Sequence, residues 1–225
     1  MNDTTLSLSF NPHHAKKLFQ TIVAFEVCLV ILYLMDHLLL SFGEPHQMID
    51  LDKEMNFPSW FSSVQLFFIG FFLLLQLFKI PKVEHFPISF ICIIALGFIF
   101  LSLDESISFH ENLTFKFVSV EWLPRFKNNH GLWIPIYLAM IVTFLFSSRK
   151  LIVDLWKHYR KELIIFSTGM ISFLIGGVVL EIISYEYLRF NESSKAYLLE
   201  VAMEEGLEMI GASFMLYASL LLALH

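Results

Sequence analysis

Residues 87–111 read PISFICIIALGFIFLSLDESISFHE, an apolar run that ends in Asp104, Glu105, His110 and Glu111. Roughly 20 apolar residues in a helix cross the hydrocarbon core of a bilayer, which is about 30 Å thick. Only helices and closed barrels satisfy all their backbone hydrogen bonds in that environment. The stretch therefore predicts a transmembrane helix that carries ionisable side chains near one end.

Five further stretches of the chain have the same character. The composition agrees, since 56% of the 225 residues are hydrophobic and 16% are charged, against roughly 45–50% and about 25% in soluble domains. A formal net charge of −6 provides no basic surface for nucleic acid. Cys28 and Cys92 lie in apolar runs and offer no disulfide framework. We expect an all-α polytopic membrane helix bundle, a single domain over 1–225, whose six transmembrane helices span about 18–41, 60–79, 87–111, 131–148, 163–187 and 197–224.

The distribution of basic residues predicts the orientation of this bundle. With the N-terminus inside, nine Lys and Arg fall on the inner side and six on the outer side, as the positive-inside rule requires. Both termini are then cytoplasmic. Residues 151–161 alternate apolar and basic side chains, which indicates a segment along the inner interface. Trp60, Trp122 and Trp133 fall near the outer boundary, where aromatic belts occur.

The acidic residues have an unusual distribution. Eleven of the 21 Asp and Glu lie within the expected spans, whereas the only Lys or Arg in those spans is Lys79, the last residue of the second span. An ionised carboxylate at the centre of a membrane helix costs about 2.5–3.5 kcal/mol, so protons, water or bound cations have to compensate. All of these acids except Glu26 lie towards the outer ends of their helices. This alignment holds for either orientation, because reversing the protein reverses every helix.

Helical spacing predicts that these acids line one pocket. Asp104, Ser108 and Glu111 share a helix face at i, i+4 and i+7. A second stripe on the last helix contains Glu204 and Glu208. Stacked carboxylates repel one another unless a cation or shared protons lie between them. With histidines nearby, the pocket suits a divalent metal, with iron, zinc or manganese favoured over copper(I). The expected ligands are Asp36, His37, Asp104, Glu105, His110, Glu111, Glu181, Glu204, Glu205 and Glu208.

Simpler interpretations stand beside the metal pocket. Acids near a helix end also occur where the side chain faces water, and for Glu111 and Glu200 the two interpretations weigh equally. Either histidine taken alone is more often a hydrogen-bonded core residue than a ligand. Glu26, alone in the inner half, is expected to pair with a polar group such as Gln76 and receives no role.

Other motifs indicate structure more than chemistry. The His-Glu pair at 110–111 begins a zincin motif, but Thr114 stands where the second histidine belongs. No histidine follows a Glu by three residues, as a ferritin-type di-iron site requires. The serines at 59, 62 and 63 follow Pro58 and indicate a capped helix start more strongly than a nucleophile. Close helix approach is expected at Gly176, Gly177, Gly206 and Gly211.

Three sequence blocks resemble a widespread, uncharacterised bacterial family of small multi-pass membrane proteins. They are NFPSWFSS at 56–63, SLDE at 102–105 with the His-Glu pair at 110–111, and EEGLEMIG at 204–211. The resemblance implies an integral protein of the bacterial inner membrane and carries no activity with it. The Asp-Glu block also resembles, more distantly, the alkaline ceramidase superfamily of seven-helix zinc hydrolases, whose paired-histidine motif is absent from this sequence.

Three functions fit these features. The leading hypothesis is a metal-binding protein or metal-dependent enzyme whose substrate is lipid-like and enters from the membrane. The alternative is a proton- or cation-coupled transporter, because intramembrane carboxylates without basic partners are natural cation sites. Against it, no acidic path continues inward beyond Glu26 and no inverted repeat is evident. The third is a structural subunit of a membrane complex. Membrane lipids and a homo-oligomer or membrane partner are the expected partners, and nucleic acid is not.

Overall fold

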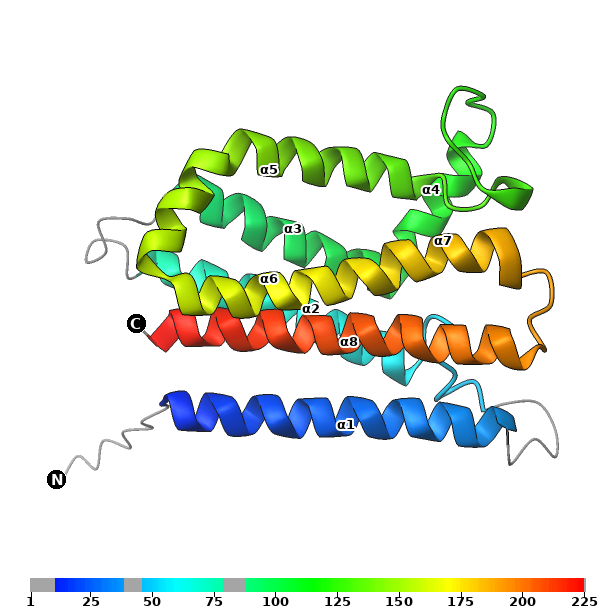
Figure 1. The fold of residues 1–225 in the computed structure, drawn as a ribbon, viewed down its shortest axis with the longest axis horizontal. Helices are drawn as coiled ribbons and strands as arrows, with labels where there is room; N and C mark the ends of the chain where they lie inside the picture. Colours follow the sequence, from blue (N-terminus) through cyan, green and yellow to red (C-terminus); the bar gives the residue numbers. More distant parts are fainter. Residues whose placement is uncertain (1–10, 39–45, 79–87, 225) are drawn as a thin grey trace, which may run out of the picture.

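The computed structural model describes residues 11–38, 46–78 and 88–224, and this part of the chain is helical without a strand (Figure 1). The membrane-length helices alternate in direction along one axis. The bounds are α1 Pro12–Leu38, α2 Phe57–Leu75, α3 Ile88–Ile107, α4 Phe109–Phe117, α5 Trp133–His158, α6 Arg160–Leu174, α7 Glu181–Ile183 and α8 Lys195–Leu224, with 3-10 turns at Gln76–Phe78 and Lys127–Asn129 and π-helical segments η4 Ile175–Leu180 and η5 Ser184–Leu188.

Six stretches in the described ranges are long and apolar enough to cross a membrane, which confirms the expected membrane helix bundle. The beginning of α1 and the end of α8 lie at the same end of the bundle (Figure 1), as six antiparallel crossings require. We name the opposite end, where α4 lies, the α4 end. The six stretches are Pro12–Leu38, Phe57–Phe78, Ile88–Ile107, Trp133–His158, Arg160–Leu188 and Lys195–Leu224.

Short polar side chains start three of these helices. Asn11 Oδ1 accepts hydrogen bonds from the first turn of α1, and Ser194 Oγ does the same for α8. Asn56 and Ser59 form a reciprocal capping box at α2, whose first turn contains Pro58. Such caps satisfy backbone N–H groups that have no partner within the helix. The capping interpretation of the serines after Pro58 is therefore confirmed for Ser59.

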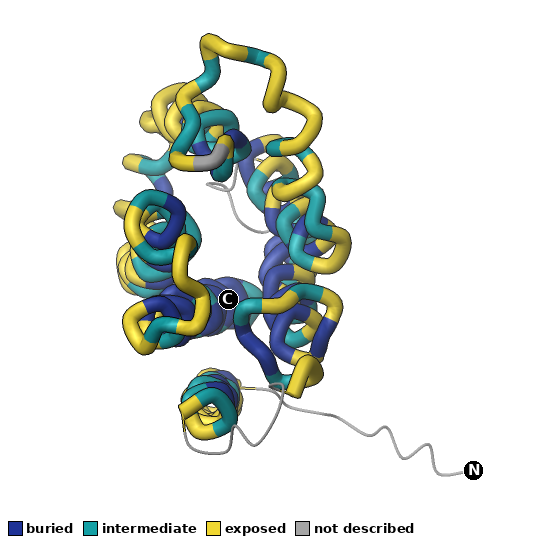
Figure 2. Tube along the Cα trace, turned by 90° about the vertical axis from the view of Figure 1, so that its right-hand side faces the viewer, coloured by how far each residue is buried: buried dark blue, intermediate teal, exposed yellow. Residues whose placement is uncertain are grey.

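The last helix forms the centre of the bundle. α8 packs against α1, α2 and α6, and end-on the buried residues gather around it (Figure 2). Met215 of α8 lies in one apolar core with Leu66 and Ile69 of α2 and Ala95 of α3. Large apolar side chains such as Phe67 remain exposed on the outer faces, where a bilayer provides an apolar environment.

Glycines allow α6 and η4 to approach α8 closely. A Cβ atom at Gly169 would lie 2.5 Å from the carbonyl oxygen of Gly211, and one at Gly211 would lie 2.6 Å from the nitrogen of Phe173. A Cβ atom at Gly176 would lie 2.6 Å from the carbonyl oxygen of Glu204. These distances are shorter than a carbon atom tolerates, so the contact depends on small residues, as is usual between membrane helices.

The third membrane helix ends four residues earlier than the sequence predicts. It stops at Ile107, and Ser108 adopts a left-handed conformation with φ of 53° before α4 begins at Phe109. Asp104 Oδ1 accepts a hydrogen bond of 2.7 Å from the backbone nitrogen of His110, so a side chain rather than the preceding helix turn satisfies this donor. The expectation that Asp104, Ser108 and Glu111 share one helix face is therefore wrong.

The segment with alternating basic residues is helical. Residues 151–158 continue α5 as one helix, and their position along the inner interface stays a prediction. The chain breaks at Tyr159, with φ −127° and ψ 39°, before α6 begins at Arg160. The expected fourth span, 131–148, is therefore extended by about ten residues at its C-terminal end.

Candidate functional site

Carboxyl groups from three helices converge in the half of the bundle nearest the α4 end. The carboxyl group of Glu105 on α3 lies within electrostatic range of Glu205 and Glu208 on α8. Glu204, also on α8, contacts the carboxyl group of Glu181 on α7. We call these five residues the acidic cluster. Acids of the third and last membrane helices, which the sequence placed at one site, therefore lie within electrostatic range of one another.

Irregular helix geometry positions two members of the acidic cluster. Glu181 lies in the short helix α7, between the π-helical segments η4 and η5. Gly177 of η4 has no side chain, and a Cβ atom there would lie 2.7 Å from Oε1 of Glu208. The carboxyl group of Glu208 therefore rests against the backbone of η4. Short π-helical segments occur frequently at functional sites.

A histidine lies between two carboxyl groups beside the acidic cluster. Nδ1 of His110 lies 3.3 Å from Oδ1 of Asp104, and its Nε2 lies 3.7 Å from Oε1 of Glu54. Tyr137 donates a hydrogen bond of 3.1 Å to the other oxygen of Asp104. Trp133 packs edge-on against the imidazole ring, with centroids 5.0 Å apart. Asp104 and the helix break at Ser108 therefore hold His110 in a fixed position.

The surroundings of this histidine favour its charged form. Burial alone lowers the pKa of His110, but the hydrogen bond and charge of Asp104, with the charges of Glu54 and Glu105, raise it from 6.5 to about 9. Burial raises the pKa of Glu54 from 4.5 to about 7, although the charge of His110 opposes that change. At neutral pH the histidine is therefore a cation, while the protonated and ionised forms of Glu54 are both present.

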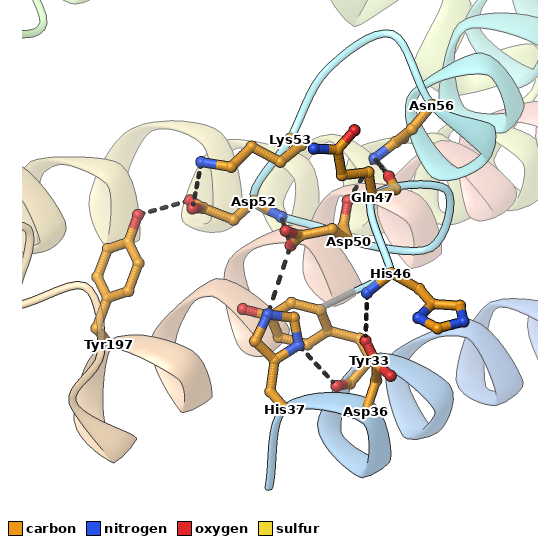
Figure 3. Close-up of polar contacts among 10 residues, drawn as sticks. All are labelled: Tyr33, Asp36, His37, His46, Gln47, Asp50, Asp52, Lys53, Asn56 and Tyr197. Carbon is orange, nitrogen blue, oxygen red and sulfur yellow. Dashed lines mark hydrogen bonds and ion pairs between the residues drawn. The ribbon is translucent and has the colours of Figure 1, made fainter. Parts of the chain in front are cut away.

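A polar pocket opens at the α4 end, between α1, the loop before α2, and the start of α8 (Figure 3). Its volume is about 400 Å³. Tyr197 of α8 donates a hydrogen bond to Asp52, and Nε2 of His37 lies 3.9 Å from Asp50. Burial is the main reason that the pKa of Asp50 is raised. The lining residues are Tyr33, His37, Gln47, Asp50, Asp52, Lys53, Glu192, Ser193, Tyr197 and Leu198.

The pocket and the acidic cluster are electrostatically connected. Asp52 lies within electrostatic range of Glu205. Arg189, directly after η5, is within range of both Asp52 and Glu181, and it also lies over the ring of Tyr185 at 5.2 Å. The charges of the pocket therefore influence the charges of the acidic cluster.

Some residues expected at the site lie elsewhere. Asp36 accepts a hydrogen bond from the backbone nitrogen of His46, and His37 belongs to the outer pocket instead of the acidic cluster. Glu111 is exposed on α4, which agrees with the interpretation that it faces water. Glu200 is only 7% exposed, so that interpretation does not hold for it.

The arrangement of ligands does not favour a preformed metal site. Within residues 11–38, 46–78 and 88–224, no three His, Cys, Asp or Glu side chains are grouped so that they could hold a metal ion. Metal binding by Asp104, Glu105 and the other expected ligands therefore stays a prediction.

Several residues of the site lie outside the spans that drew attention in the sequence. Asp50, Asp52 and Glu54 alternate in the loop before α2, and this spacing of three acids was the available signal. The sequence did not indicate a role for Tyr137 or Arg189, because an aromatic residue in an apolar helix and an arginine in a loop are both common. Their roles depend on which helix ends come together.

The chain matches the model of a family described as a domain of unknown function, DUF8692, over residues 22–224. It therefore belongs to this family, in agreement with the expected uncharacterised family of multi-pass membrane proteins. No curated protein and no solved structure is significantly similar to it. A relation to the alkaline ceramidases is not supported by this family match.

Proposed function

We propose that this member of the DUF8692 family is a proton-coupled cation carrier that binds its ions at the acidic cluster. One observation carries the proposal: carboxyl groups of α3, α7 and α8 lie within electrostatic range of one another inside a membrane bundle. Two like charges at 4 Å repel by about 4 kcal/mol at an effective dielectric constant of 20. Bound positive charge is therefore needed wherever these groups come together.

The same geometry supports exchange between protons and other cations. A carboxylate that holds a proton no longer attracts a metal or alkali ion, and a bound cation in turn disfavours protonation. Because Glu105, Glu205 and Glu208 are within range of one another, one cation affects the protonation of all three. Binding of a cation from the pocket is therefore coupled to release of protons.

Transport through proteoliposomes tests this proposal. Vesicles with an acidic interior receive Na⁺, K⁺, Mg²⁺, Ca²⁺ or Mn²⁺ outside, and a pH-sensitive dye reports collapse of the proton gradient. We expect at least one cation to collapse the gradient with wild-type protein. Glu208→Gln should slow the collapse about tenfold to 100-fold, because an interaction with a charged group contributes about 1.5–3 kcal/mol.

The control is Glu111→Gln, which changes an exposed acid on α4 and should transport like wild type. Vesicles that contain folded wild-type protein and hold their proton gradient against all five cations would show that the proposal is wrong. Loss of transport in Glu111→Gln to the same degree as in Glu208→Gln would also contradict it.

A second candidate is a metal-dependent protein of the bacterial inner membrane that acts on a lipid-like substrate. The arrangement of His110 between Asp104 and Glu54 favours it, because one imidazole and two carboxylates are ligands for iron, zinc or manganese. A metal would have to draw these side chains together, since Glu54 and Asp104 bind opposite ring nitrogens. Water activation or Lewis-acid chemistry would follow from such a metal.

Metal analysis of detergent-purified protein separates the two candidates. The second candidate predicts about one metal ion per chain, retained during purification and lost in an Asp104→Ala variant, where a ligand is missing. Glu111→Ala serves as the control and should retain the metal. Metal-free wild-type protein that stays metal-free after incubation with iron, zinc and manganese would contradict it, while leaving the carrier proposal intact.

A further inference from the structure

A second polar group lies deep in the bundle, away from the acidic cluster. Glu26, near the middle of α1, is 0% exposed, and Gln65 of α2 and Ser213 of α8 are 3% and 1% exposed. Nε2 of Gln65 donates to Oε1 of Glu26 at 2.6 Å, and Oγ of Ser213 donates to the same oxygen at 2.7 Å. Three membrane helices therefore contribute to one buried polar contact, where the sequence suggested a pairing with Gln76.

Two oxygen atoms of this group are left without a hydrogen bond. Oε2 of Glu26 and Oε1 of Gln65 are buried and have no partner among the described residues. Both donors that reach Glu26 go to its other oxygen. A buried polar atom without a partner costs about 1–3 kcal/mol, and an ionised carboxylate in a membrane interior costs more. These two oxygens can therefore accept a hydrogen bond or bind a cation.

The charges and donor atoms indicate which partner fits these oxygens. Glu26 supplies one negative charge, and its polar neighbours Gln65 and Ser213 are uncharged, so one positive charge neutralises the group. A divalent ion would leave an excess charge buried in the bundle, which is costly. Carboxylate, amide and hydroxyl oxygens are hard ligands that suit hard cations. We propose that Glu26, Gln65 and Ser213 form a site for one exchangeable monovalent cation, either a proton or a sodium-sized alkali ion.

This site deepens the proposed function and rests on it for its physiological role. Ser213 follows Glu208 by five residues on α8, a rise of about 7.5 Å along the helix axis. The site therefore provides a binding position further into the membrane than the acidic cluster. The sequence showed no acidic path beyond Glu26, and the contacts with α2 and α8 now connect Glu26 to the helix that carries the cluster.

Carbodiimide labelling of purified full-length protein tests the site. Dicyclohexylcarbodiimide reacts with a protonated carboxyl group in an apolar environment. The carboxyl oxygen bonds to the central carbon of the reagent while the acid proton moves to a nitrogen, and transfer of the acyl group to nitrogen leaves a stable N-acylurea. We expect tandem mass spectrometry to locate this adduct on Glu26 in sodium-free buffer, and to find none at position 26 in Glu26→Gln.

Added sodium distinguishes the two cations. If sodium occupies the site, sodium chloride at about ten times the dissociation constant slows labelling of Glu26 about tenfold by mass action, whereas choline chloride does not. If only the proton binds, both salts leave the rate unchanged. In either case Gln65→Leu changes the labelling rate of Glu26, because it removes the unpaired amide oxygen. The matched control Gln76→Leu removes another buried glutamine, one that contacts the Phe72 carbonyl, and leaves the rate unchanged.

Absence of the adduct in sodium-free buffer, with a melting temperature that neither sodium nor Glu26→Gln alters, would overturn the proposal. Equal labelling rates in wild type, Gln65→Leu and Gln76→Leu would also overturn it. These results do not depend on transport. If Glu26 is labelled but the protein transports no cation, the Glu26 site is supported and the proposed carrier function is wrong. If the protein transports a cation but Glu26 is not labelled, the carrier function is supported and the Glu26 site is not.

Discussion

Between pH 6.5 and pH 9 we expect the wild-type protein in detergent to lose on the order of 3 kcal/mol of stability, and His110→Gln to lose far less. The pKa of His110 rises from 6.5 to about 9 on folding. Each pKa unit corresponds to about 1.36 kcal/mol. A raised histidine pKa stabilises the folded protein fully below pH 6.5, and that stabilisation disappears as the pH rises through about 9.

The measurement is the apparent melting temperature of wild type and variants at pH 6, 7.5 and 9. A loss of about 3 kcal/mol corresponds to roughly 6–12 °C in a protein of this size. Glu54 acts in the same direction at lower pH, because its folded form retains a proton from pH 4.5 to about 7. Glu54→Gln should therefore flatten the profile below about pH 7, and it should also reduce the loss above pH 7, because the charge of Glu54 helps to raise the pKa of His110.

His130→Gln is the matched control for this experiment. His130 stacks on Tyr185, and burial lowers its pKa instead of raising it, so its substitution leaves the slope between pH 6.5 and pH 9 in place. The same slope in His110→Gln as in wild type would show that Asp104 and Glu54 do not hold a charged histidine.

The second large effect is expected at the contact between α6 and α8. Gly211→Ala should destabilise the protein by about 1–3 kcal/mol, the usual cost of overpacking a close contact. The added carbon would lie 2.6 Å from the nitrogen of Phe173 and 2.7 Å from the carbonyl oxygen of Gly169. Backbone atoms cannot move aside as a flexible side chain does, so the two helices have to separate.

Gly97→Ala provides the comparison within the same protein. A Cβ atom at Gly97 of α3 meets nothing within 4 Å, so alanine there should raise the melting temperature slightly through its higher helix propensity. Thermal unfolding of both variants in the same detergent measures the difference. Equal melting temperatures for Gly97→Ala and Gly211→Ala would mean that the glycine contact does not hold α6 against α8.

Local signals in the sequence predicted the helices well and their ends less well. Apolar runs of membrane length identified all six spans, because the hydrocarbon thickness sets a minimum length that the composition reveals directly. The end of α3 was missed by four residues. By its sequence alone, Asp104 is compatible either with a longer α3 or with a hydrogen bond to the first turn of α4. In the structure, Asp104 accepts hydrogen bonds from the His110 backbone and from Tyr137, and these contacts favour the second arrangement.

The candidate site was predicted in outline. Glu105, Glu205 and Glu208 were expected to face each other, and they lie within range of one another. Asp36 was expected with them and instead bonds to the loop at His46. The position of each acid along its helix predicted its depth in the membrane. The sequence did not predict which neighbouring helix each acid faces, because that depends on how the helices pack.

The pairing of Glu26 shows where the sequence and the tertiary structure divide. From the sequence alone, this protein had to be a bundle of membrane helices with carboxyl groups that lack basic partners within the membrane, because apolar length and the cost of buried charge act on each segment separately. Gln65 and Gln76 were equally available to Glu26 on that basis. Only the packing of α1, α2 and α8 brought Gln65 and Ser213 to Glu26 and left Gln76 on the carbonyl of Phe72. Contacts between helices depend on distances across the bundle, which no single segment contains.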